Sequence, residues 1–251
     1  MVFDKKPYEI LLERASEKIA RTSLEIGAIK LRPEQPFQWA SGYFMPIYND
    51  NRLQLQKYEY RRTIADAFGI MLMANGILIN EHSDVIAGVA TSGISPATSL
   101  ADSHRASLVY VRDKPKAHGM KNRIEGIPDD QDLGNRRVVL IEDLVSTGGS
   151  SVDAVQAIRD ANGSIDTCLA IFSYNLDVAS KMFSGELPYD KEKTRTLETP
   201  CKILPILTYE TLLKVAIETG NINAEQQKML EEWRADPFNW GENHGFPRVE
   251  K

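Results

Sequence analysis

Short apolar runs alternate with segments of helical spacing between residues 85 and 173, and this alternation restricts the possible folds more than any other feature of the chain. Strands are predicted over residues 85–89, 107–111, 137–141 and 165–173. Helices are predicted between them, over residues 94–104 and 149–161. Apolar strands this short, separated by helices, are typical of a parallel sheet that is covered on both faces. The sequence therefore predicts an α/β fold.

The segments on either side of this alternation predict additions to the sheet. Helical spacing predicts helices over residues 7–26 and 57–74, and the second ends at Asn75-Gly76, a common C-terminal cap. Residues 32–52 are rich in proline and aromatic side chains and predict a short hairpin or a loop region. After the sheet, an apolar segment and two short helices are predicted over residues 202–207, 209–219 and 223–234.

Composition excludes several classes of protein. The 251 residues include only two cysteines, too few for a disulfide framework or a cysteine-based zinc site. No apolar run approaches the roughly 20 residues that a membrane helix needs, and residues 1–6 lack the apolar core of a signal peptide. The net charge of −5 argues against a nucleic-acid partner, because phosphate backbones select basic surfaces. We expect a cytoplasmic enzyme or small-molecule binder with no membrane partner.

The segment 138–151 carries the strongest chemical signal. An apolar strand leads into two adjacent carboxylates, Glu142 and Asp143, and then into a loop of serine, threonine and glycine that opens a helix. Backbone N–H groups at such a helix start bind anions such as phosphate, at the sheet edge where α/β folds hold their ligands. The acids would then bind ribose hydroxyls or a Mg²⁺ carried by the ligand. The alternative is a strand–turn–helix corner with an Asp- and Ser-rich cap.

Two further segments are candidates for anion binding. The turn at residues 88–93 is bracketed by glycines, so its N–H groups could hold a diphosphate, or it could be an ordinary strand-to-helix turn. Residues 112–123 concentrate five basic side chains in a chain that is acidic overall. The stretch 113–136 is long for a connector, which favours a lid over the site, the alternative being a solvated surface loop.

These segments together resemble a known family. The 138–151 motif is similar to the phosphoribosyl-pyrophosphate (PRPP) motif of type I phosphoribosyltransferases. Three other segments resemble the orotate phosphoribosyltransferases, namely residues 37–42, 46–52 and 112–119, and residues 231–234 resemble one bacterial branch of that family. The resemblance implies the type I phosphoribosyltransferase fold, a mostly parallel sheet flanked by helices, with a small hood from both chain ends and a mobile loop. It divides the chain into an N-terminal helix and base-binding hood segment, a PRPP-binding core and a C-terminal helical extension, over residues 1–56, 57–207 and 208–251.

The resemblance also implies an activity. Such an enzyme transfers the phosphoribosyl group from PRPP to N1 of orotate, giving orotidine 5′-monophosphate and diphosphate in the synthesis of pyrimidine nucleotides. The implied cofactor is Mg²⁺ carried by PRPP, with no metal site made by the protein alone. The implied assembly is a homodimer in which the 113–136 loop serves the active site of the partner.

Residue roles follow from the same resemblance. The implied catalytic residues are Lys116, His118 and Asp143. The implied PRPP contacts are Arg112, Lys116, His118, Thr91, Ser92, Glu142, Asp143, Leu144, Val145, Ser146, Thr147, Gly148, Gly149 and Ser150. The implied orotate contacts are Ser146 and Tyr48.

The sequence departs from the family pattern at several positions. Ser92 and Ala40 stand where many members have lysine, and Phe44-Met45 stands where the most similar branch has Lys-Ser. These changes remove positive charge, and Phe44 either stacks on a base or belongs to the core. They keep open a phosphoribosyltransferase for another nucleobase, and a non-catalytic PRPP-binding regulator is a third hypothesis. Residues 50–52 either order the base-binding segment or form an Asx-type turn.

Overall fold

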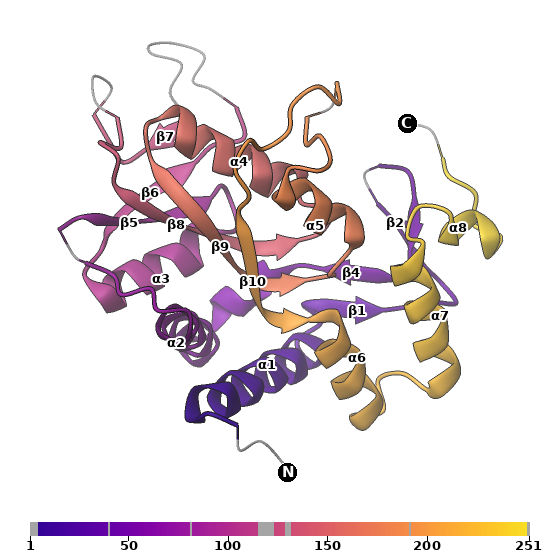
Figure 1. The fold of residues 1–251 in the computed structure, drawn as a ribbon. Helices are drawn as coiled ribbons and strands as arrows, with labels where there is room; N and C mark the ends of the chain where they lie inside the picture. The colour runs from indigo at the N-terminus through magenta and orange to yellow at the C-terminus, as the bar shows by residue number, and fades with distance from the viewer. Residues whose placement is uncertain are drawn as a thin grey trace.

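A six-stranded sheet forms the centre of the molecule (Figure 1). The computed structural model describes residues 5–39, 41–80, 82–114, 123–128, 132–190 and 192–249. The strand order is β10-β9-β8-β5-β6-β7. The strands are β5 (Asp84–Val89), β6 (Ser107–Val111), β7 (Ile124–Glu125), β8 (Arg137–Val145), β9 (Ser164–Ser173) and β10 (Lys202–Thr208). All neighbours pair in parallel except β7, which is antiparallel to β6 at one edge, so the prediction of a mostly parallel sheet is confirmed.

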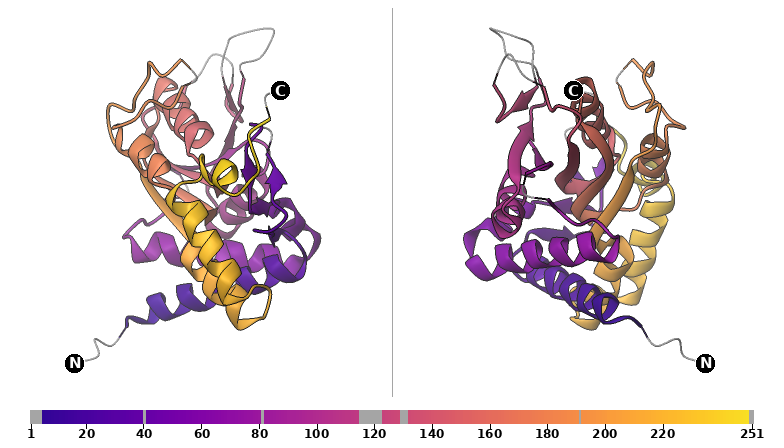
Figure 2. Two further views of the ribbon diagram at one scale, coloured as in Figure 1. Left: turned by 90° about the vertical axis from the view of Figure 1, so that its right-hand side faces the viewer. Right: turned by 60° about the vertical axis from the view of Figure 1, so that its left-hand side comes forward.

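Helices cover both faces of this sheet (Figure 2). One face packs on α1 (Pro7–Glu25), α2 (Tyr58–Ala74), α3 (Ile94–His104) and α6 (Tyr209–Glu218). The other face packs on α4 (Gly149–Asp160) and α5 (Asp177–Ser184). The central strand β5 is buried along its whole length, as a strand with apolar residues on both sides must be.

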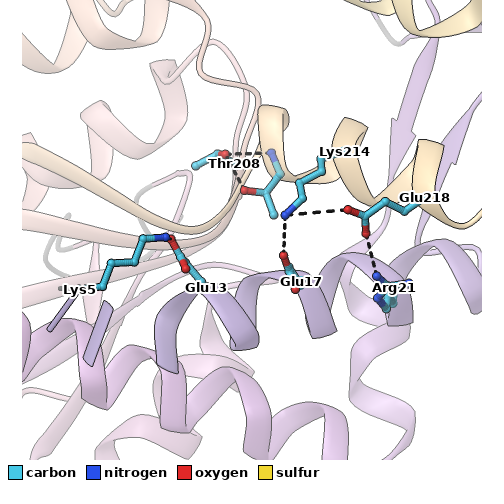
Figure 3. A network of polar contacts seen from close by, with 8 residues as sticks. Lys5, Glu13, Glu17, Arg21, Thr208, Lys214 and Glu218 are labelled. Atoms are coloured by element: carbon cyan, nitrogen blue, oxygen red, sulfur yellow. Dashed lines mark hydrogen bonds and ion pairs between the residues drawn. The ribbon is translucent and has the colours of Figure 1, made fainter. Parts of the chain in front are cut away.

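Ion pairs connect two helices that are distant in sequence (Figure 3). On α1, Glu17 accepts from Lys214 of α6 at 2.9 Å, and Arg21 donates to Glu218 of α6 at 2.9 Å. All four side chains are at least a third exposed, so each pair contributes well under about 1 kcal/mol. None of these four residues lines the cavity described below.

The two chain ends meet beside the sheet. N-terminal residues form two small antiparallel pairs, β1 (Ile29–Leu31) with β4 (Ile47–Asn49) and β2 (Phe37–Gln38) with β3 (Phe44–Met45), followed by the 3₁₀ helix η1 (Asn51–Gln56). C-terminal residues form α7 (Ala224–Ala235) and α8 (Trp240–Asn243), which lie next to these strands in Figure 1 and in the left view of Figure 2. The partly buried ring of Trp39 packs with the buried rings of Tyr174 and Trp233, with centroids 5.3–6.4 Å apart, and so joins the two ends. The expected hood made by both ends is present.

The predicted elements of the core agree with the structure to within a few residues, with one informative exception. The predicted strand 137–141 continues to Val145, so Glu142 and Asp143 lie inside β8 and not beyond its end. The cause is nonlocal, because β9 continues to pair with β8 as far as Ser173 opposite Val145. The short elements β7, α5 and α8 were not predicted. No helix in the described ranges is both long and apolar enough to cross a membrane.

Candidate active site

A cavity of about 550 Å³ opens at the carboxyl ends of the central strands. It is lined by the ends of β5, β6 and β8, by the loop after β8, and by Asn49, Asp50 and Arg52 from the hood. The predicted residues that line it are Thr91, Ser92, Arg112, Glu142, Asp143, Leu144, Ser146 and Ser150. The fold thus brings together three segments that sequence analysis had proposed separately. Their individual roles toward PRPP remain predictions.

Two carboxyl groups stand side by side at the floor of this cavity. Glu142 is only 4% exposed, and its side chain accepts hydrogen bonds from the Ser151 hydroxyl at 2.8 Å and from the Asp143 N–H at 3.0 Å. Burial raises the pKa of Glu142 well above its usual range, and the neighbouring Asp143 charge raises it further. Burial also raises the pKa of Asp143. Two adjacent carboxyl groups whose pKa values are both raised are typical of a functional site.

The start of α4 forms one wall. Gly148, with a φ of +89°, provides the left-handed turn from β8 into the helix, and a Cβ there would lie 3.3 Å from Ala179. The first N–H groups of a helix have no intrahelical partner, and the flanking Ser146 and Ser150 line the cavity. This wall therefore suits a phosphate. Val145 is fully buried, and Thr147, Gly148 and Gly149 lie beside the lining residues in the chain.

The glycine-bracketed turn forms another wall. A Cβ on Gly88 would lie 2.8 Å from the Gly93 oxygen, and a Cβ on Gly93 would lie 2.5 Å from the Ile141 oxygen. Both glycines are thus required by close backbone packing, Gly88 against the start of α3 and Gly93 against β8 and the end of β5. Thr91 and Ser92 line the cavity between them, so the turn is both a strand-to-helix connection and a wall of the site. The Ala90–Thr91 peptide bond is cis.

Cationic side chains approach from the β6–β7 side. Arg112 lines the cavity and donates to Glu125 at 3.0 Å. Arg123 also lines it, donates to the Arg112 carbonyl at 2.9 Å and pairs with Asp153 at 2.7 Å. The predicted catalytic residues Lys116 and His118 lie outside the described residues, as does Ala40.

Three further lining residues were not among the predicted PRPP or orotate contacts, although residues 50–52 had been considered for ordering the base-binding segment. Asn49, Asp50 and Arg52 line the cavity, and Arg52 forms a two-point ion pair with Asp50, at 2.6 and 2.9 Å. The Arg52 N–H also donates to Asp50 at 3.2 Å, so the expected Asx-type turn is present and both hypotheses for this segment are compatible with the structure. The available signal was the run of polar residues at the end of the predicted hairpin or loop region, 32–52.

The hood residues expected near the base have a mixed outcome. Tyr48 is 38% exposed and its ring lies 5.6 Å from that of Phe37, but it is not among the cavity-lining residues, so its contact with orotate stays a prediction. Phe44 packs on Phe246 of the C-terminal segment at 5.9 Å, and Met45 is buried under Trp233, whose indole N–H donates to its sulfur at 2.9 Å. The packing alternative for Phe44 is the one that the structure supports.

The site has oxygen donors suited to a hard cation, although not a complete metal cage. No group of three or more His, Cys, Asp or Glu that could hold a metal is found among the described residues. Glu142 and Asp143 offer carboxylate oxygens beside the cavity, and Mg²⁺ is commonly bound by one or two carboxylates together with substrate oxygens. The donor set therefore fits a Mg²⁺ that arrives with a phosphorylated ligand.

The fold, the acid pair and the serine- and glycine-rich wall at the start of α4 indicate a class of protein, and comparison with known proteins agrees. Residues 60–192 match the family described as "Phosphoribosyl transferase domain". The chain is 39% identical to the orotate phosphoribosyltransferase of Cytophaga hutchinsonii over 228 residues, which cover 90% of this chain and 98% of that one. It is also 39% identical to the Bacillus subtilis enzyme of the same name, over 87% of this chain and 92% of the other. The chain belongs to the orotate phosphoribosyltransferase family.

Solved structures show the same fold. A chain of Leishmania donovani UMP synthase superposes with a TM-score of 0.66 at 22% identity, covering 89% of this chain and 43% of that longer one. Orotate phosphoribosyltransferase from Aeropyrum pernix superposes with a TM-score of 0.60 at 24% identity, covering 82% of this chain and 99% of the other. The expected type I phosphoribosyltransferase fold is confirmed.

Proposed function

We propose that the chain transfers the phosphoribosyl group of PRPP to N1 of orotate, giving orotidine 5′-monophosphate and diphosphate for pyrimidine nucleotide synthesis. The observation that carries the proposal is the acid pair of buried Glu142 and half-buried Asp143, in a cavity also lined by the loop before a helix N-terminus and by a glycine-bracketed turn. Close relatives named as orotate phosphoribosyltransferases support orotate as the acceptor.

The walls of the cavity suit the parts of PRPP. The loop at 146–150 would hold the 5′-phosphate through helix-start N–H groups and hydroxyls. Asp143, with Glu142 behind it, would hold the ribose hydroxyls and face the positive charge that develops on the sugar. Thr91, Ser92 and Arg112 would surround the departing diphosphate. Mg²⁺ bound by the substrate would supply further neutralisation of that leaving group. Catalysis then depends on alignment and charge stabilisation.

The first experiment follows orotate consumption by absorbance, with PRPP and Mg²⁺ present and each omitted in turn. Consumption that requires both supports the proposal. Consumption of another nucleobase instead would overturn the choice of orotate and favour the alternative that Ala40 and Phe44-Met45 raised. PRPP binding by calorimetry without turnover of any base would favour the non-catalytic regulator.

We further propose a cytoplasmic homodimer in which Lys116 and His118 of one protomer serve the site of the other. Both residues lie outside the described ranges. The support for this assembly is therefore the family resemblance. Two inactive variants, Lys116→Ala and Asp143→Asn, provide the test. Mixed at random, half of the dimers hold both variants and each of these has one intact site, so roughly a quarter of wild-type activity should return. No recovery after verified subunit exchange would show that the loop acts within its own protomer.

A further inference from the structure

Strand β8 stops pairing with one of its two neighbours before Glu142 and Asp143. β8 pairs with β5 on one side and with β9 on the other. The last β5 pair joins Gly88 and Ile141, whereas pairing with β9 continues to Val145. At Asp143 the side of β8 that faced β5 therefore has no ladder partner, and a buried strand carbonyl without a hydrogen-bond donor is costly.

A single side chain supplies the missing donor. The Nδ2 of Asn51 donates to the Asp143 carbonyl oxygen at 2.7 Å, across 92 positions of sequence. Asn51 is 3% exposed, and the hydrogen bond to half-buried Asp143 is itself partly buried. Its Oδ1 in turn accepts from the Asn49 side chain at 3.3 Å. Because a carbonyl can only accept, the amide of Asn51 has one possible orientation, and that orientation sets the direction of the Asn49 contact too.

The position of Asn51 relates this hydrogen bond to the site of the proposed reaction. Asn51 begins η1, directly after the short strand β4 that carries Tyr48, and its neighbours Asp50 and Arg52 line the cavity. Asp143 lines the same cavity from β8. The Asn51–Asp143 hydrogen bond is thus a direct link between the hood segment expected to hold the base and the strand expected to hold the ribose.

We propose that Asn51 is a positioning residue that sets the placement of the nucleobase relative to the ribose of PRPP. The inference rests on the proposed function and deepens it. The reaction joins the base to the sugar, so an error in their relative placement slows the bond-forming step even when each substrate is still bound. Asn51 acts through the backbone of Asp143 and the hood segment and need not touch either substrate.

Gln54 offers a matched control on the same 3₁₀ helix. It is 2% exposed, and its side-chain amide donates to the Ser23 hydroxyl of α1 at 2.6 Å. Asn51→Leu and Gln54→Leu both remove a buried amide hydrogen bond from η1, but only the first removes the link to Asp143. Asn51→Asp keeps the size of the side chain and places a second acceptor against the Asp143 carbonyl.

The experiment measures kcat, the KM for each substrate and the thermal midpoint for wild type and these three variants. We expect Asn51→Leu to lower kcat about tenfold to a hundredfold with both KM values changed less than about threefold. Asn51→Asp should lower kcat at least as much, and Gln54→Leu should lose similar thermal stability with kcat within about twofold of wild type.

Three outcomes overturn the inference. It is wrong if folded Asn51→Leu or Asn51→Asp keeps the wild-type kcat, because the hydrogen bond is then not needed for alignment. It is also wrong if Gln54→Leu loses as much kcat as Asn51→Leu, since the effect then reflects the stability of η1 alone. A wild-type chain that consumes no orotate overturns the proposed function and this inference with it.

Discussion

The two ends of the central sheet are both hollowed, but they handle charge in opposite ways. The cavity at the amino ends of β8, β9 and β10 is the larger, about 640 Å³ against about 550 Å³ at the carboxyl ends. At the amino end, buried Asp84 accepts from Arg137 at 2.5 and 3.2 Å and from the Asn80 N–H at 2.6 Å. Burial would raise the pKa of Asp84, but these hydrogen bonds outweigh it and hold the pKa below its usual value.

At the carboxyl end the acids lack such compensation. Glu142 and Asp143 both have raised pKa values, because burial dominates over the hydrogen bonds they accept. The difference teaches that volume does not locate the site in this molecule. The site is located instead by the poorly compensated carboxyl groups of Glu142 and Asp143, which lie at the sheet end where α/β folds bind ligands.

Removing a charge at the carboxyl end should have the largest effect on activity. Asp143→Asn keeps the shape of the side chain but removes the charge that would face the sugar, so we expect the turnover rate to fall about a hundredfold or more. The folded protein should be at least as stable as wild type, because a disfavoured buried charge is gone. Steady-state kinetics and urea denaturation of the same sample measure both. Turnover within about threefold of wild type would return the acid pair to a capping role.

At the amino end the corresponding change should affect folding and leave the reaction alone. Arg137→Leu removes the two guanidinium hydrogen bonds to Asp84, leaving only that from the Asn80 N–H, and a further hydrogen bond from Arg137 to the Leu78 carbonyl. We expect the free energy of unfolding to fall by about 2 kcal/mol at neutral pH, with kcat within about twofold of wild type.

The pH dependence of this loss has a definite sign. The lowered pKa of Asp84 means that its charged form stabilises the fold above its unfolded pKa of about 3.9, and this contribution disappears as the pH falls through the folded value. The difference between wild type and Arg137→Leu in urea denaturation should therefore shrink on acidification. A large loss of kcat would contradict the contrast between the two ends.

The same contrast shows what local sequence could and could not predict. Helix 94–104 was predicted to the residue, because a glycine precedes it and its apolar spacing is regular. The end of β8 was misplaced, since polar Glu142 and Asp143 resemble a strand end and only pairing with β9 carries the strand further. The place of Phe44 depends on Phe246, and the donor to the Asp143 carbonyl is Asn51. Contacts between residues so far apart in sequence leave no periodic pattern along the chain.

Glu142→Gln should sharpen the comparison through stability. Because burial and Asp143 raise the pKa of Glu142, its charged form destabilises the fold as the pH rises above the usual glutamate value of about 4.3. Glutamine keeps an acceptor for the Asp143 N–H, so we expect a gain of about 1 kcal/mol in unfolding free energy near pH 8. The gain should vanish toward pH 4. At high pH its sign is opposite to that of Arg137→Leu, which lowers the unfolding free energy. Urea denaturation at the two pH values checks this, and an equal gain at both would point to packing instead.

The smallest effect is expected from Lys202→Ala at the rim of the larger cavity. Lys202 is an exposed cation whose Nζ donates to the Asn75 side chain at 2.9 Å, and solvent can replace that contact. We expect less than about 0.5 kcal/mol in unfolding free energy and no change in kcat or in the KM for PRPP. We expect so small an effect because no described carboxylate at the amino end depends on Lys202 in the way that Asp84 depends on Arg137. A change of more than twofold in the KM for PRPP would mean that the larger cavity affects substrate binding. Both ends of the sheet would then influence the reaction, and the contrast drawn between them would be wrong.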